Sequence, residues 1–96
     1  ANKRWDGLTL EEKEKFAPIC PDFVIELRSR TDALSQLQTK MQEYLNSGLQ
    51  LGWLIDPQSQ KVEIYRQNQP REIVSLPTTL LGENILPGFN LELPIF

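Results

Sequence analysis

The chain has 96 residues, a net charge of −3 and no histidine, and 40% of its residues are hydrophobic against 24% charged. This length and composition predict a single globular domain over residues 1–96. The lack of histidine and the single cysteine exclude His-based catalytic triads, structural zinc sites and internal disulfides.

Charge and cysteine content also bear on partners and location. The acidic balance argues mildly against general polyanion binding, although bound divalent metals supply positive charge in many nucleases. The lone Cys20 fits a reducing compartment. No apolar run approaches the ~20 residues that a membrane helix needs. We therefore expect a cytoplasmic protein without a membrane partner.

The first predicted elements are a short helix and a strand. Thr9 and Glu12 have the spacing of a capping box, and Pro18 ends the helix that they begin. The strand is PDFVIELR, residues 21–28, whose apolar residues at 23, 25 and 27 face one way. Its other face carries Asp22, Val24, Glu26 and Arg28.

The clearest helix is TDALSQLQTKMQEYLNSG, residues 31–48. Thr31 is the expected N-cap and Gly48 the expected end. At about 100° per residue, one apolar stripe forms along this helix. The stripe consists of Ala33, Leu34, Leu37, Met41, Tyr44 and Leu45.

The later segments predict strands. LQLGWLID, residues 49–56, is apolar enough for a strand covered on both faces, whereas the alternating KVEIYR, residues 61–66, predicts a half-exposed partner after a turn. REIVSL, residues 71–76, and an end strand over residues 89–93 follow. The strand–helix–strand unit from 22 to 56 predicts a parallel crossover, so the fold class is a mixed α/β sheet with the long helix on one face, followed by an antiparallel hairpin and end strands.

Charged residues on the predicted strand raise the question of a site. Asp22, Glu26 and Arg28 share one face, and carboxylates presented from a sheet can hold Mg²⁺ or Mn²⁺. Such a metal lowers the pKa of a bound water and stabilises charge on a phosphate. The alternative is a half-exposed strand with a solvated Glu26–Arg28 pair.

The predicted helix offers further candidates. Gln36, Lys40 and Tyr44 are spaced i, i+4 and i+8 in one line that can reach toward Glu26. Each has a simpler alternative: Lys40 extends to water, Tyr44 packs in the core and Gln36 lies on the surface.

Four stretches closely resemble one family. PDFVIELRSRTD, LQTKMQEYLNSG, LGWLIDPQSQKVEIYR and ENILPGFNLEL resemble the bacterial Uma-type "putative restriction endonuclease" family of the PD-(D/E)XK nuclease superfamily. The resemblance covers about residues 5–96. Its most specific pieces are PDFVIEL with Ser29 and Asp32, the pair Lys40 and Tyr44, and GWLIDP.

This resemblance implies a restriction-endonuclease-like fold, a Mg²⁺ or Mn²⁺ site and DNA as substrate. Glu26 matches the acidic residue of the (D/E)XK element, and Arg28 stands where that element has lysine. An arginine stays protonated and cannot replace a titrating lysine. The resemblance places the lysine function at Lys40. Under the nuclease hypothesis, Gln36 and Tyr44 support the site.

One departure concerns the second metal ligand. In relatives, the metal-binding Asp lies in an earlier strand with its own PD motif, and Asp22 matches the later PD instead. We therefore expect the chain to be the C-terminal part of a longer protein, with a half-built metal site formed by Glu26 and Asp22. A missing strand would leave an open sheet edge for another chain.

Two functions follow as hypotheses. The first is a metal-dependent DNA endonuclease that hydrolyses phosphodiesters with a metal-activated water. The second is a non-catalytic binding or assembly module that keeps the fold and forms homo-oligomers through sheet edges or through Trp5 and Trp53.

Overall fold

The computed structural model describes residues 21–96, which form two sheets and one helix. The elements are β1 (Phe23–Leu27), α3 (Leu34–Asn46), β2 (Leu51–Asp56), β3 (Lys61–Arg66), β4 (Glu72–Ser75), β5 (Thr78–Leu81) and β6 (Asn90–Leu93). The helix predicted from Thr9 and the contacts predicted for Trp5 lie outside the described residues.

The main sheet has the strand order β1-β2-β3-β4. β1 and β2 are parallel and joined through α3, whereas β3 and β4 add antiparallel neighbours. The mixed sheet and the parallel crossover predicted from the sequence are therefore confirmed. β5 and β6 form a separate antiparallel pair, of which only β6 was predicted as a strand.

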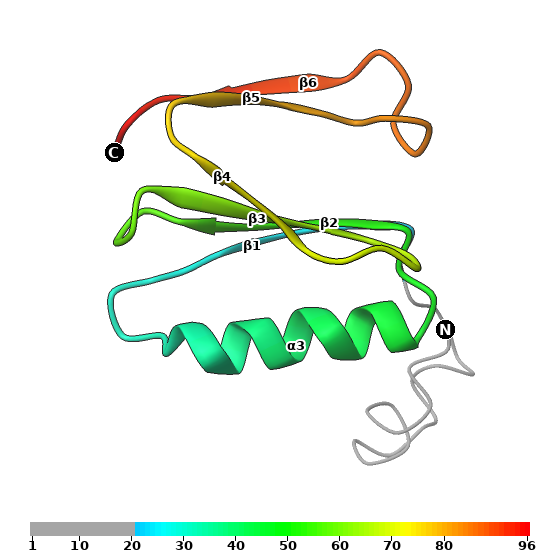
Figure 1. The fold of residues 1–96 in the computed structure, drawn as a ribbon, viewed down its shortest axis with the longest axis horizontal. Coiled ribbons are helices and arrows are strands. Elements are labelled where there is room, and N and C mark those ends of the chain that lie inside the picture. Colours follow the sequence, from blue (N-terminus) through cyan, green and yellow to red (C-terminus); the bar gives the residue numbers. More distant parts are fainter. Residues whose placement is uncertain (1–20) are drawn as a thin grey trace, which may run out of the picture.

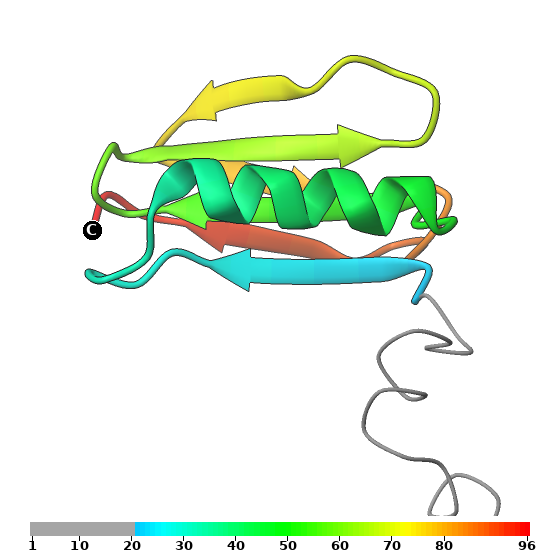
Figure 2. The same cartoon turned by 90° about the horizontal axis from the view of Figure 1, so that it is seen from below.

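The elements stack in three layers. Figure 1 shows α3 on one face of the main sheet and the β5–β6 pair on the other. Seen from the helix side, α3 lies over the sheet along the direction of its strands (Figure 2). Both faces of the central strands are thus covered, and all six residues of β2 are buried, as predicted.

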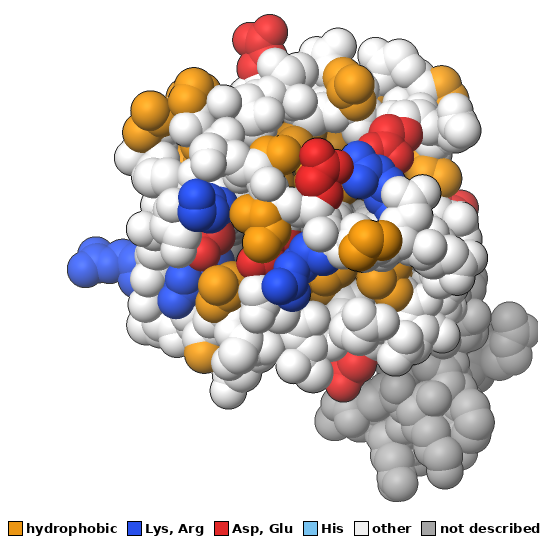
Figure 3. Space-filling model, viewed as in Figure 1, with side chains coloured by type: hydrophobic (Ala, Val, Ile, Leu, Met, Phe, Trp, Pro, Cys, Tyr) orange, Lys and Arg blue, Asp and Glu red, His pale blue; other side chains and the backbone are white. Residues whose placement is uncertain are grey.

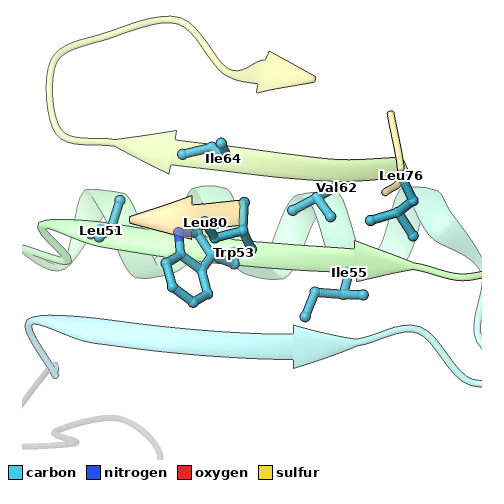
Figure 4. Close-up of a cluster of buried hydrophobic side chains, with 7 residues drawn as sticks. All are labelled: Leu51, Trp53, Ile55, Val62, Ile64, Leu76 and Leu80. Atoms are coloured by element: carbon cyan, nitrogen blue, oxygen red, sulfur yellow. The ribbon is translucent and has the colours of Figure 1, made fainter. Parts of the chain in front are cut away.

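A first apolar cluster fills the space between the main sheet and the β5–β6 pair (Figure 4). Trp53 is its largest member and has no exposed surface, so the prediction that Trp53 contacts another chain was wrong. Its ring meets Phe23 edge-on at 4.8 Å and stacks with Phe89 at 6.2 Å. Because β3 contributes Val62 and Ile64 here, this strand is buried on the face away from the helix.

A second cluster lies between the sheet and α3, with Met41, Leu49, Leu54 and Tyr65 buried at its centre. The helical stripe predicted from the sequence packs here, except Ala33, which is exposed and precedes the helix. β3 is consequently buried on both faces, and its prediction as a half-exposed strand was wrong. The reason is the second layer formed by β5 and β6.

Gly52 allows α3 to approach the sheet closely. A Cβ atom at this position would lie 2.6 Å from Cε of Met41 and 2.9 Å from Cδ2 of Leu49. Real Cβ atoms are not found at such distances, so only glycine fits beneath Met41 without a shift of its neighbours.

The start of α3 differs from the prediction. The helix begins at Leu34 with Ala33 as N-cap and no side-chain capping bond, so Thr31 is not the cap. Ser29 instead donates from its backbone N and its Oγ to Asp32 Oδ2, at 2.9 and 2.8 Å. These bonds hold residues 29–32 in a turn before the helix. The predicted end is confirmed, because Gly48 follows the helix with φ of 111°.

Within residues 21–96, no helix is long and apolar enough to cross a membrane.

Candidate functional site

Glu26 lies on the helix-facing side of β1. Its neighbour two residues back, Val24, packs into the cluster beneath α3, and alternation along the strand sends Glu26 to the same side. Glu26 pairs in register with Leu54 of β2. Its side chain is 19% exposed, so the carboxylate is partly desolvated and still reachable from solvent.

Lys40 reaches this carboxylate from α3. Its Nζ lies 3.1 Å from Glu26 Oε2, and its side chain is 49% exposed. The hydrogen bond to Glu26 is the main reason that the pKa of Lys40 is raised above its usual value. The structure thus brings together the two residues that the sequence singled out, one from each side of the crossover.

Gln36 does not reach Glu26, and Tyr44 lies beside Lys40. The Gln36 side chain is exposed, and no hydrogen bond joins it to Glu26 within residues 21–96. Tyr44 is half-buried and packs against the cluster beneath α3. It lies near enough to Lys40 to contribute to the raised pKa of that residue.

Asp22 lies away from Glu26. Four residues of strand separate their Cα atoms by about 13 Å at ~3.3 Å per residue. This distance is too long for one Mg²⁺ ion, whose bonds are about 2.0–2.1 Å. Among the described residues, no three His, Cys, Asp or Glu side chains form a group that could hold a metal.

Arg28 pairs with Asp56 and not with Glu26, which excludes the predicted solvated Glu26–Arg28 pair. Its Nη1 lies 3.2 and 3.1 Å from the two carboxylate oxygens of Asp56, and its Nε donates to the carbonyl of Asp32. Asp56 is 2% exposed and also accepts from the backbone N of Gln58 and Ser59. Arg28 therefore joins the ends of β1 and β2.

A buried polar group beside the site was missed by sequence reasoning. Glu63 accepts hydrogen bonds from Gln38 Nε2 at 2.8 Å and Tyr65 Oη at 2.7 Å, and Arg71 Nε lies 3.7 Å away. Burial and the bond to Glu63 raise the pKa of Tyr65 well above its usual value. Glu63 lies in the middle of β3, and a charged residue in a strand covered on both faces would have indicated a buried polar group. Because β3 was predicted to be half-exposed, Glu63 was placed on its solvent face.

Glu26 and Glu63 lie in one row across the sheet, on either side of Leu54. Lys40 binds the first and Gln38 the second, so α3 contacts a carboxylate on each flank. These two contacts fix the helix laterally over β2.

The sequence matches the Uma2 family, described as "putative restriction endonuclease", over residues 1–94. The chain belongs to this family. No curated protein matches it.

The fold is also similar to a solved structure. A protein from Anabaena variabilis ATCC 29413, described as a "putative nuclease belonging to DUF820", is 31% identical with a TM-score of 0.69. The similarity covers 77% of this chain and 42% of that protein. This chain thus spans less than half the length of its neighbour, and both comparisons support a nuclease-like fold.

Proposed function

We propose that the chain carries part of the active site of a metal-dependent DNA endonuclease, which hydrolyses phosphodiester bonds with a metal-activated water. The observation that carries this proposal is the 3.1 Å contact between Glu26 and Lys40. It places an acidic and a basic side chain together at the crossover of a chain whose family is described as "putative restriction endonuclease".

Glu26 is the proposed metal ligand. Mg²⁺ keeps several waters and is usually bound through one or two carboxylates plus substrate phosphates, so a single partly exposed carboxylate fits half of such a site. A bound divalent ion supplies a water of lowered pKa and stabilises negative charge on the phosphate. Because Asp22 lies too far away, we propose that a further carboxylate comes from outside residues 21–96 or from another chain.

Lys40 is the proposed electrostatic partner of the substrate. Its ammonium group lies 3.1 Å from the Glu26 carboxylate and brings a positive charge and hydrogen-bond donors to the proposed site. A positive group fixed beside the reacting phosphate stabilises the charge that develops there. Gln36 and Tyr44, one turn before and after Lys40, are proposed to support this placement.

The test is nicking of supercoiled plasmid in Mn²⁺ by this chain and by the variant Glu26→Gln. The matched control is Glu92→Gln, which removes the same charge from an exposed residue of β6. We expect Mn²⁺-dependent nicking that Glu26→Gln abolishes and Glu92→Gln preserves. If the chain alone is inactive, the assay is repeated with the upstream part of the protein restored. Equal nicking by the wild type and Glu26→Gln in that longer protein would contradict the proposal.

A second candidate is a non-catalytic assembly module, and one observation favours it. β1 is an edge strand of the described sheet. On its face away from α3, Ile25 is 43% exposed and Leu27 is 59% exposed. Unpaired edges with apolar side chains are templates for pairing with another chain. Sedimentation of the wild type and of Ile25→Lys tests this function: a dimer that the substitution dissociates, together with absent nicking, would favour assembly.

A further inference from the structure

Two cationic side chains in the described part of the chain lack a carboxylate partner. Residues 21–96 contain four cations that pair with Asp or Glu: Arg28 with Asp56, Lys40 with Glu26, Arg66 with Glu72 and Glu83, and Arg71 with Glu63. The remaining two are Arg30 and Lys61, both exposed. Arg30 makes no hydrogen bond or ion pair within residues 21–96, and Lys61 contacts the Ser75 hydroxyl at 3.3 Å.

Arg30 and Lys61 lie at the same end of the main sheet. Arg28 follows β1 beside Asp56, and Asp56 pairs in register with Lys61 across β2 and β3. Two strand spacings separate the Cα atoms of Arg28 and Lys61 by about 10 Å. Gln58 donates to the carbonyl of Ser29 at 2.9 Å, so the β1–α3 loop that carries Arg30 is joined to the turn that precedes Lys61.

The loop that carries Arg30 is held from several sides. Ser29 bonds to Asp32, Arg28 donates to the carbonyl of Asp32, and Arg28 also binds the buried Asp56. A cation on such a loop loses less conformational freedom when it meets an anion than a cation on a mobile loop. This loop also connects the strand of Glu26 to the helix of Lys40.

The charge of the chain is unevenly distributed. This end carries four cations (Arg28, Arg30, Lys40, Lys61) against three acids (Glu26, Asp32, Asp56), whereas the rest of the described residues carry two cations (Arg66, Arg71) against six acids (Asp22, Glu43, Glu63, Glu72, Glu83, Glu92). Figure 3 shows Lys and Arg side chains gathered toward the edge where the β1–α3 loop and the β2–β3 turn lie. This end of the sheet therefore carries a net positive charge, although the whole chain is net negative.

We propose that Arg30 and Lys61 contact phosphates of the nucleic-acid backbone beside the phosphodiester that reacts at the proposed site of Glu26 and Lys40. This inference rests on the proposed function and adds the residues that position its substrate. Arginine matches phosphate with a planar fork of donors, and lysine binds it as a compact point charge. Phosphate contacts fix the orientation of a duplex without reading its sequence. The two residues thus serve affinity and register, while Glu26 and Lys40 serve the chemistry.

The experiment measures how binding depends on salt. The anisotropy of a fluorescein-labelled 20-base-pair duplex is titrated with protein in EDTA between 50 and 200 mM KCl. The variants are Arg30→Gln, Lys61→Gln and their combination. The matched control is Gln69→Glu, which changes the net charge equally at an exposed position of the β3–β4 turn.

Each lost phosphate contact should lower the magnitude of the slope of log K against log salt by about 0.9 on duplex DNA, and the double variant should lower it by about 1.8. Gln69→Glu should leave the slope unchanged. Slopes of Arg30→Gln and Lys61→Gln equal to that of the control would overturn the inference, as would a wild type without salt-dependent binding.

The same set separates this inference from the proposed nuclease function. One outcome is that Glu26→Gln is as active as the wild type while the salt slopes of Arg30→Gln and Lys61→Gln change as expected. In that case Glu26 is not the metal ligand, and the phosphate contacts are supported. If Glu26→Gln abolishes nicking while the slopes stay constant, only the phosphate contacts fail.

Discussion

Replacing Arg28 by alanine removes the partner of a buried carboxylate. The side chains of Arg28 and Asp56 are 17% and 3% exposed, so water cannot readily take the place of the guanidinium. Breaking a buried pair from one side costs about 3–5 kcal/mol. Asp56 keeps two hydrogen bonds from the backbone N of Gln58 and Ser59. We therefore expect Arg28→Ala to lower the free energy of unfolding by about 3 kcal/mol, at the low end of that range.

The assay is urea unfolding followed by tryptophan fluorescence, which reports on the fully buried Trp53. With a denaturant slope of about 1.5 kcal/mol/M, a loss of about 3 kcal/mol moves the midpoint down by about 2 M. The control is Arg30→Ala in the same loop, where the lost side chain has no carboxylate partner among the described residues. Its effect should stay within about 0.5 kcal/mol.

Two results would refute this reasoning. A midpoint for Arg28→Ala within about 0.3 M of the Arg30→Ala control would show that the ion pair does not stabilise the fold. A double variant, Arg28→Ala with Asp56→Asn, should recover part of the loss because it removes the unpaired charge. No recovery would show that the buried carboxylate is not the cause. Nuclease activity lost in Arg28→Ala under folded conditions and kept in Lys40→Ala would contradict the role proposed for Lys40.

Two further predictions concern titrating groups. Because the pKa of Tyr65 is raised, its neutral side chain stabilises the fold fully below the unfolded pKa of about 10 and less as pH rises above it. Tyr65 should therefore stay neutral in the folded protein at pH 11, and the tyrosinate absorbance of Tyr65→Phe should match that of the wild type. A lower absorbance in the variant would contradict the burial of Tyr65. Tyr65→Phe should also cost about 1.5–3 kcal/mol in urea unfolding, because Glu63 loses a hydrogen bond. The raised pKa of Lys40 predicts that its pair with Glu26 stabilises the fold fully below about 10.5 and progressively less above. Since Lys40 is half exposed, the free energy of unfolding of Lys40→Gln should lie below that of the wild type by less than about 1 kcal/mol at pH 8. This difference should shrink by pH 11.5. A difference that stays constant with pH would contradict the ion pair with Glu26.

Local patterns predicted the crossover and half of the site. The apolar run of β2, the stripe of α3 and the alternation of β1 reflect periodicities that the chain carries within a few residues. Because β1 and α3 are adjacent in sequence, their spacing was also enough to bring Glu26 and Lys40 together.

The rest depends on contacts between distant segments. The burial of β3 follows from the β5–β6 layer, which lies above it and comes later in the chain. Alternation alone predicts a half-exposed strand with Val62 and Ile64 on its apolar face and Glu63 on its solvent face. In the structure, α3 covers the face of Glu63 and the β5–β6 pair covers the apolar face. The pairing of Arg28 with Asp56 likewise spans 28 residues and requires the register of β1 against β2, which no local pattern contains.

Gly52 bears on two polar contacts that the helix above it makes, Lys40 with Glu26 and Gln38 with Glu63. The bare backbone at this position leaves room for the ends of the Met41 and Leu49 side chains between α3 and the sheet. A methyl group there would have to displace Met41 and Leu49. Any lift of the helix would carry Lys40 away from Glu26 and Gln38 away from Glu63 together. A substitution at position 52 that the Met41 and Leu49 side chains absorb by turning aside should leave both polar contacts intact, whereas one that lifts the helix should weaken both together.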